Sequence, residues 1–219
     1  MRRLIGVLAF SLTTFGASAA FAQAAGMGQS GTVAFGAERL FAFYKSNVSY
    51  EQPNGDEQDW DQSGLGFGWN GVGFQFPFNM ARLGFDYFIT DQFTVGGALG
   101  YASVDDEDDG PSGDYEAFLL APRGGYFHGF NETFAIWPRA GLTYHSLDPD
   151  GDRNNQSGLA LTLEAMFTIS PAPHFAFMAG PTFDIDFLGE VECGNQNQDE
   201  DCKLRYRSFG LQVGLLGYF

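Results

Sequence analysis

The sequence predicts an all-β protein, a transmembrane antiparallel up-and-down β-barrel of about eight strands. Three observations point to this fold. Segments of about ten residues alternate apolar side chains with small or polar ones, which is the pattern of strands with one apolar face. The chain has 30 glycines and 24 phenylalanines, and 16% aromatic residues accompany only 17% charged ones. Short turns alternate with long polar connections, as in barrels that cross an outer membrane.

The first residues predict a cleavable export signal. Two arginines open the chain, an apolar stretch follows from Leu4 to Phe15, and Ala20-Phe21-Ala22 supplies a small-x-small exit. These three features together are typical of secretory signal peptides. An uncleaved helical anchor, the alternative, needs roughly 20 apolar residues in a row. We therefore expect a signal peptide over residues 1–22 and one barrel domain over residues 23–219.

Eight segments show a period of two. In the clearest, 159–169 and 175–187, Leu, Phe and Ile alternate with Thr, Asp, Glu and Met. Because successive side chains of a strand point to opposite faces, each segment has one face suited to lipid. Glu38-Arg39 interrupts the alternation of the first segment, and the Gly-rich stretch 64–78 fits either a strand or an ordered loop. The predicted strands cover residues 33–47, 80–89, 93–101, 115–127, 134–144, 159–169, 175–187 and 204–219.

Connection lengths predict which strand ends lie outside the cell. Outer-membrane barrels have short periplasmic turns and long extracellular loops. Most acidic residues of this chain, whose formal net charge is −16, fall in the long connections. We therefore expect acidic extracellular loops, and the charge disfavours nucleic acid as a partner. The expected turns are 90–92, 129–133 and 170–174, and the expected loops are 48–73, 105–114, 146–157 and 188–203.

The two cysteines, Cys193 and Cys202, lie nine positions apart in a polar segment. An exported chain meets an oxidising compartment, so the pair predicts a disulfide that staples a loop. The alternative is a metal site. Two thiolates without a neighbouring histidine make a poor one.

The C-terminal sequence from Gly210 to Phe219 alternates apolar residues and ends in phenylalanine. With this ending and its strand pattern, the chain resembles the small outer-membrane barrels that include the OmpA transmembrane domain and OmpX. The resemblance implies an integral protein of the bacterial outer membrane, with Phe219 as part of the signal read by the barrel-assembly machinery. Gly217 departs from that signal, which more often has a large apolar residue there. The resemblance does not imply the activity of one member.

Charged residues within the strands predict a salt-bridged plug inside the barrel. At about 3.3 Å per residue and a tilt near 40°, several of them fall in one layer, about 12–18 Å from the short-turn rim. Charges at that depth face the interior and pair with one another. Eight strands enclose a space that side chains just fill, which favours a plug. A narrow conduction path is the alternative. The expected members are Arg82, Asp86, Arg123, Arg139, Glu164 and Asp184, with Glu38 as a further acidic partner.

One histidine has the neighbours that a lipid-modifying enzyme of the outer membrane would need. His145 precedes Ser146 and lies near Asp148. Adjacent side chains on a strand point to opposite faces, so His145 and Ser146 are not expected to form a catalytic pair. The sequence therefore predicts a protein without catalytic residues.

Asp148, Asp150 and Asp152 place oxygen ligands at alternate positions around Gly151, as in part of a calcium loop. The segment lacks the bidentate glutamate at the twelfth position of such loops, and Arg153 lies inside it. Weak binding of calcium or magnesium by the loops is the cofactor hypothesis that remains.

Arg205 and Arg207 lie on the predicted lipid-facing side of the last strand, at its outer end. A guanidinium pairs with phosphate through two hydrogen bonds, so these residues are candidates for contact with lipopolysaccharide. Alternatively, they simply mark the end of the apolar band.

Taken as a whole, the sequence predicts a non-enzymatic barrel exposed at the cell surface. It would stabilise the outer membrane or present acidic loops to ions, lipopolysaccharide or a protein partner. A narrow small-solute pore and an enzyme that modifies lipid A or phospholipid are the alternatives.

Overall fold

The computed structural model describes residues 26–68, 78–104, 115–149, 155–193 and 201–219. Within these ranges there is no helix with the length and apolarity needed to cross a membrane. Paired strands are all antiparallel. The strands are β1 (Val33–Glu51), β2 (Glu57–Phe67), β3 (Arg82–Phe88), β4 (Phe93–Val104), β5 (Tyr115–Tyr126), β6 (His128–Gly129), β7 (Phe134–Pro149), β8 (Gln156–Ala172), β9 (Phe175–Glu192) and β10 (Asp201–Tyr218).

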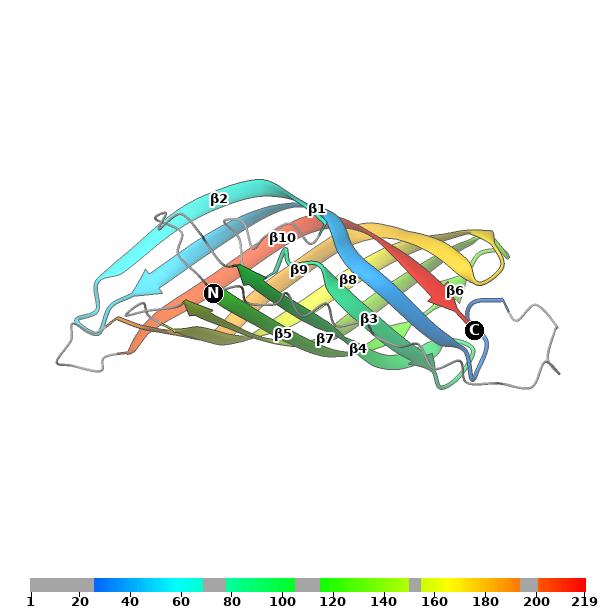
Figure 1. Ribbon diagram of the computed structural model, residues 1–219, viewed down its shortest axis with the longest axis horizontal. Helices are drawn as coiled ribbons and strands as arrows, with labels where there is room; N and C mark the ends of the chain where they lie inside the picture. Colours follow the sequence, from blue (N-terminus) through cyan, green and yellow to red (C-terminus); the bar gives the residue numbers. More distant parts are fainter. Residues whose placement is uncertain (1–25, 69–77, 105–114, 150–154, 194–200) are drawn as a thin grey trace, which may run out of the picture.

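Eight of these strands close into a barrel (Figure 1). The order around the ring is β1, β3, β4, β5, β7, β8, β9 and β10, and β10 pairs with β1 to complete it. The closing seam runs along β1 from the pair Ala34 and Tyr218 to the pair Glu51 and Lys203. The short β6 pairs with the start of β7. The prediction of an eight-stranded antiparallel barrel is confirmed.

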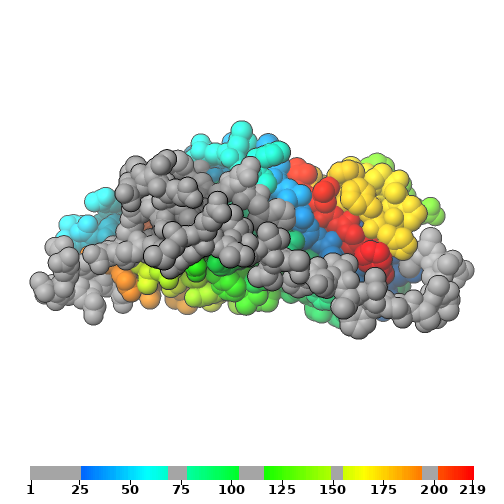
Figure 2. Space-filling view, in the orientation of Figure 1, coloured from blue at the N-terminus to red at the C-terminus, as the bar shows by residue number. Residues whose placement is uncertain are grey.

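The two faces of each strand follow the alternation of the sequence. On β8, Leu161, Leu163 and Phe167 are exposed on the outside, whereas Glu164 and Met166 are buried inside. Other strands repeat this pattern and form an apolar belt around the barrel. Figure 2 shows one face of the molecule, coloured along the chain. An exposed apolar area of this extent is typical of a surface that contacts a partner or a membrane. Further members of the belt are Phe43, Leu83, Phe85, Val95, Leu99, Leu120, Leu142, Phe177, Phe183, Phe209 and Leu211.

The connection predicted over residues 48–73 is partly wrong. β1 continues to Glu51, and β2 returns along it from the pair Glu51 and Glu57 to the pair Phe41 and Phe67. β1 thus pairs on one side with β3 near its start and with β2 over the rest. The acidic outer face of β2 looks like loop sequence, but backbone pairing with β1 holds it as a strand. Residues 69–77 lie outside the described part.

The strands also extend further than predicted at the end opposite the short turns, which we call the loop end. β7 reaches Pro149, β8 begins at Gln156, β9 reaches Glu192, and β10 begins at Asp201. The predicted loops 146–157 and 188–203 are therefore too long, because backbone pairing continues where side chains are no longer apolar. The 18 residues of β10 rise about 45 Å at a tilt near 40°, against an apolar band of about 25 Å.

Two kinds of layer fill the interior. Towards the other end, which we call the turn end, Phe88, Trp137 and Met166 form an apolar layer. Towards the loop end, Leu119 and Phe78 belong to two further apolar clusters. Between these layers each contributing strand carries charged residues. The fold therefore places buried charges at mid-height with apolar packing on both sides.

Candidate functional site

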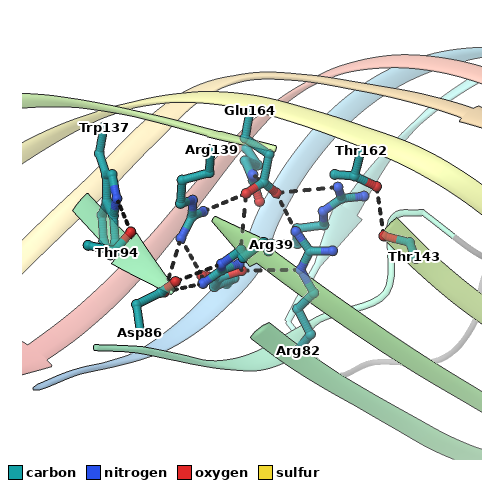
Figure 3. A network of polar contacts seen from close by, with 12 residues as sticks. Arg39, Arg82, Asp86, Thr94, Trp137, Arg139, Thr143, Thr162 and Glu164 are labelled. Carbon is teal, nitrogen blue, oxygen red and sulfur yellow. Dashed lines mark hydrogen bonds and ion pairs between the residues drawn. The ribbon is translucent and has the colours of Figure 1, made fainter. Parts of the chain in front are cut away.

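A cluster of charged side chains lies inside the barrel between the apolar layers (Figure 3), and we call it the charged plug. Every member is buried, and the most exposed, Arg123, is only 9% exposed. Four arginines face four carboxylates, so their formal charges cancel. Charges at such depth persist only when they pair. The charged plug consists of Glu38, Arg39, Arg82, Asp86, Arg123, Arg139, Glu164 and Asp184.

Glu38 on β1 is contacted by arginines from three other strands. Arg123 donates from Nη1 to Oε2 at 2.7 Å and from Nη2 to Oε1 at 2.6 Å. Arg139 donates from Nη1 to Oε1 at 2.8 Å, and Arg82 donates from Nε to Oε2 at 3.2 Å. One carboxylate therefore ties β1 to β3, β5 and β7 across the barrel interior.

Glu164 on β8 forms the second acidic centre of the plug. Arg82 Nη2 donates to its Oε1, and Arg139 Nη2 lies 2.8 Å from its Oε2. Gln212 Nε2 on β10 donates to Oε1 at 3.0 Å. In Figure 3, Arg82 and Arg139 flank Glu164 from either side. The two arginines bridge Glu164 and Glu38, so the plug is one connected network.

The other two carboxylates of the plug, Asp86 and Asp184, each pair with an arginine. Arg123 Nε donates to Asp86 Oδ1 at 3.0 Å. Arg39 Nη2 lies 3.2 Å from Asp184 Oδ2, and Thr162 Oγ1 donates to Asp184 Oδ1 at 2.7 Å. Each carboxylate of the charged plug thus has an arginine partner.

Arg39 is the member that the sequence analysis did not identify. Glu38 and Arg39 are consecutive and both buried, although neighbours on a regular strand point to opposite faces. The β1–β10 register shifts between Ala37 and Phe41, and Arg39 has a φ of 55°. An irregularity of this kind re-aims a side chain. The interrupted alternation at Glu38-Arg39 was the signal that could have predicted it.

The plug leaves little space. A cavity lined by Arg82, Arg123, Arg139, Thr143 and Thr162, among others, measures about 10 Å³, which is about the room that one water needs. On the turn-end side, Arg139 lies over the ring of Trp137 at 4.9 Å from its centroid. Trp137 in turn donates from Nε1 to Thr94 Oγ1 at 3.1 Å. Charges and aromatic packing together occupy the cross-section at this height.

Among the predicted plug residues, the structure brings six into direct contact. They are Glu38, Arg82, Asp86, Arg123, Arg139 and Glu164, which touch within one network. Asp184 joins them through Arg39, which also lies 3.6 Å from Glu164.

His145 has a different acidic neighbour from the one considered in the sequence. Its ring is fully buried, and Nε2 lies 3.3 Å from Asp186 Oδ2. Gly158 is its cross-strand neighbour, and a Cβ at that position would collide with Nε2. Ser146 follows on the continuing strand β7 and points to the other face. The structure therefore does not bring His145 and Ser146 together.

The predicted calcium ligands lie at the loop end. Asp148 is exposed near the end of β7, and Asp150 and Asp152 lie outside the described residues. Where the chain is described, no group of three or more His, Cys, Asp or Glu side chains could hold a metal ion. Calcium binding stays a prediction.

The disulfide between Cys193 and Cys202 is present, with the two Cα atoms 5.8 Å apart. It joins the end of β9 to the start of β10. Further along β10, Arg205 and Arg207 are exposed on the outer face. At the turn end, Phe219 is 70% exposed, and its backbone exchanges two hydrogen bonds of 2.9 Å with Val33.

Comparison with known proteins adds evidence on the fold. No family model matches the chain, and no curated protein matches it by sequence. The solid-state NMR structure of the outer membrane protein AlkL in lipid bilayers superimposes with a TM-score of 0.53 at 12% identity, covering 87% of this chain and 91% of AlkL. The fold is that of a small outer-membrane barrel.

Two crystal structures of outer-membrane barrels are also similar. Neisserial surface protein A is 15% identical, with a TM-score of 0.45, and the match covers 87% of this chain and 98% of that one. Ail of Yersinia pestis is 13% identical, with a TM-score of 0.41 and coverage of 87% and 100%.

Proposed function

We propose that this chain is an integral protein of the bacterial outer membrane whose barrel is sealed to solutes. It acts without catalysis, as a scaffold that stabilises the membrane and displays its loop end at the cell surface. The charged plug is the observation that carries the proposal. It fills the interior with paired side chains from six strands, which is the arrangement of a cross-linked core.

Two features support the membrane location. The apolar belt encircles the barrel, and it gives way to polar outer residues on the loop-end side, where Lys45 and Arg207 follow Phe43 and Phe209. A belt bordered by charges matches the profile of a bilayer with its headgroups. Backbone pairing along the closed ring also satisfies the peptide groups that lipid cannot solvate.

The display role rests on the strands that pass beyond the belt. At the loop end, β1 and β2 form a hairpin with Asp59 and Asp61 on its outer face. The strands that precede and follow the acidic segments predicted to be extracellular end here. We propose that it faces the outside of the cell, where an acidic surface of this kind would meet ions or a protein partner.

Single-channel recording in planar lipid bilayers tests the sealed barrel. We expect no reproducible conductance steps from the wild type. The double substitution Arg139→Ser and Glu164→Ser removes two long side chains of opposite charge from the plug, and we expect it to create measurable steps. The matched control is Glu51→Ser with Lys203→Ser, which removes an exposed ion pair of 3.0 Å and should stay silent.

Steady conductance from the wild type would contradict the proposal. If the folded plug variant stayed silent, the plug would not be the element that seals the barrel. Equal mobility of the unheated and the boiled variant in gel electrophoresis would reveal a barrel that had failed to fold.

A further inference from the structure

The cations of this acidic chain are sharply divided between two places. Of the arginines and lysines in the described residues, four lie in the charged plug. All the others lie on the outer faces of β1 and β10 near the loop end. These two strands run side by side (Figure 1). We call this second group the basic ridge. It consists of Lys45, Lys203, Arg205 and Arg207.

Two cations of the basic ridge already have acidic partners. Lys45 Nζ lies 3.2 Å from Asp61 Oδ2, and Lys203 Nζ lies 3.0 Å from Glu51 Oε1. The ion pairs of the described residues include neither Arg205 nor Arg207. Their cross-strand neighbours on β1 are Ser49 and Asn47, which carry no charge. Within the part of the chain that the structure describes, the two guanidinium groups are thus exposed cations that form no ion pair.

The arginines stand at the border of the apolar belt. Below them on the same face of β10 follow Phe209 and Leu211, which are 50% and 52% exposed. Beside them on β9 lie Phe187 and Leu188, also exposed. In a membrane this border coincides with the headgroup phosphates, and the apolar side chains below it meet the acyl chains. The surface therefore offers cations to the headgroup of a lipid and apolar side chains to its acyl chains.

The backbone under the arginines is held on both sides. β10 pairs with β1 along the closing seam and with β9 on its other edge. The disulfide at Cys202 fixes the strand three residues before Arg205. Side chains two apart on a strand project from the same face about 7 Å from each other. Such a fixed pair loses less freedom on binding than a mobile loop would.

We infer that Arg205 and Arg207 form a binding site for the phosphate groups of a phosphorylated membrane lipid, whose acyl chains lie along Phe209 and Leu211. The inference rests on the proposed membrane location. Guanidinium groups recognise phosphate through paired, charge-assisted hydrogen bonds, which gives this site a preference for phosphate monoesters over the phosphodiesters of zwitterionic headgroups. Asn47 and Ser49 lie beside it on β1, and their side chains donate hydrogen bonds to Asp61 and Glu57 of β2. The lipid class that fits is one with exposed phosphate monoesters on its headgroup, such as bisphosphorylated lipid A.

The test uses the full mature chain folded into phosphatidylcholine nanodiscs that contain a small fraction of bisphosphorylated lipid A. Native mass spectrometry after gentle release counts the lipid A molecules retained. We expect the wild type to retain lipid A and the variant Arg205→Gln with Arg207→Gln to lose at least tenfold in retention. Arg205→Lys with Arg207→Lys should lie between them. Lys203→Gln is the matched control, because Glu51 already neutralises that lysine, and we expect less than a twofold change.

Equal retention by the glutamine variant and the wild type would overturn the inference, as would equal retention of enzymatically dephosphorylated lipid A. A third arm adds inorganic phosphate to the protein in neutral detergent without lipid A. Saturable binding of phosphate alone, with no gain from the acyl chains, would make this a site for free phosphate and would also overturn the inference. The same glutamine variant is recorded for conductance. A folded, silent barrel that fails to retain lipid A leaves the sealed scaffold standing, so the two proposals fail separately.

Discussion

Glu38 and Arg123, 85 positions apart in the sequence, form a two-point ion pair across the inside of the barrel. Both distances, 2.6 and 2.7 Å, are short, and paired contacts of this kind are the stronger form of charge-assisted hydrogen bond. Arg82 and Arg139 also point at Glu38, so one carboxylate balances three cations. The stability of the barrel should therefore depend strongly on this single side chain.

Glu38→Gln tests that dependence. The amide keeps the shape of the side chain but leaves three buried guanidinium groups facing a neutral partner, and breaking a buried pair in this way costs about 3–5 kcal/mol. Guanidinium unfolding in lipid vesicles, followed by tryptophan fluorescence, should show a lower midpoint. Glu132→Gln, at an exposed turn, is the control and should leave the midpoint unchanged. Equal midpoints for both variants would refute a structural role for the plug.

Gly158→Ala tests how tightly the imidazole ring of His145 packs against β8. The added methyl would collide with the imidazole ring, and overpacking of this kind typically costs about 1–3 kcal/mol. The tightest contacts are with the ring, and a contact of 2.9 Å with Leu188 O remains without it. The same substitution should therefore cost less in a His145→Ala background, and the double-mutant cycle should show coupling of about 1 kcal/mol. Gly124→Ala is the control, since the nearest atom to its added Cβ, Thr94 O, lies at 3.6 Å. Strict additivity would show that the ring and the glycine do not compete for space.

Reduction of the disulfide should loosen the loop end. By the loop-entropy estimate, a bridge across nine positions stabilises the fold by about 2–3 kcal/mol. Cys193→Ser with Cys202→Ser should therefore speed amide hydrogen exchange at residues 190–192 and 201–203, which pair beside the bridge. Exchange at the turn end, over residues 176–180, serves as the internal control. Faster exchange everywhere would mean that the bridge stabilises the whole barrel.

Asp61 should titrate below the ordinary range for an aspartate. The hydrogen bond from Asn47 Nδ2, at 3.2 Å, and the neighbouring Lys45 lower the pKa of its exposed carboxyl. Because the folded-state pKa is the lower one, its contribution to stability is complete above the unfolded-state pKa and is lost as the pH falls through the folded value. Carbon-13 NMR titration of the carboxyl group gives the midpoint. In Asn47→Ala that midpoint should rise, and a midpoint that stays in place would assign the shift to another cause.

The ring of strands could be predicted because lipid imposes a strict pattern. Outward residues of the belt, such as Leu163 and Phe167, must be apolar, so a period of two is visible in the amino-acid sequence. β2 was not predicted as a strand, because its residues Asp59 and Asp61 lie beyond the belt, where outward side chains need not be apolar. Its position as a strand comes from pairing with β1, a contact that local sequence does not encode.

Most residues of the plug could be predicted, but the pairing of its arginines with its carboxylates could not. Strand depth placed Arg82, Arg123, Arg139 and Glu164 in one layer, because each belongs to a regular strand whose inward face can be counted. Arg39 could not be placed that way, since only the irregularity in β1 turns it inward. Which carboxylate each arginine would choose depends on side-chain reach across the interior, and that information is not periodic.

The seam between β1 and β10 also shapes the route by which the barrel forms. It pairs Ala34 with Tyr218, residues from nearly opposite ends of the described chain, so no local hairpin can nucleate it. Contacts of such long range raise the contact order, and topologies rich in them fold slowly. Until β10 arrives, one edge of β1 remains an open template for pairing with another chain. For as long as the seam is open, the nascent barrel is therefore exposed to pairing with another chain, so the rate at which β10 reaches β1 sets how long that exposure lasts.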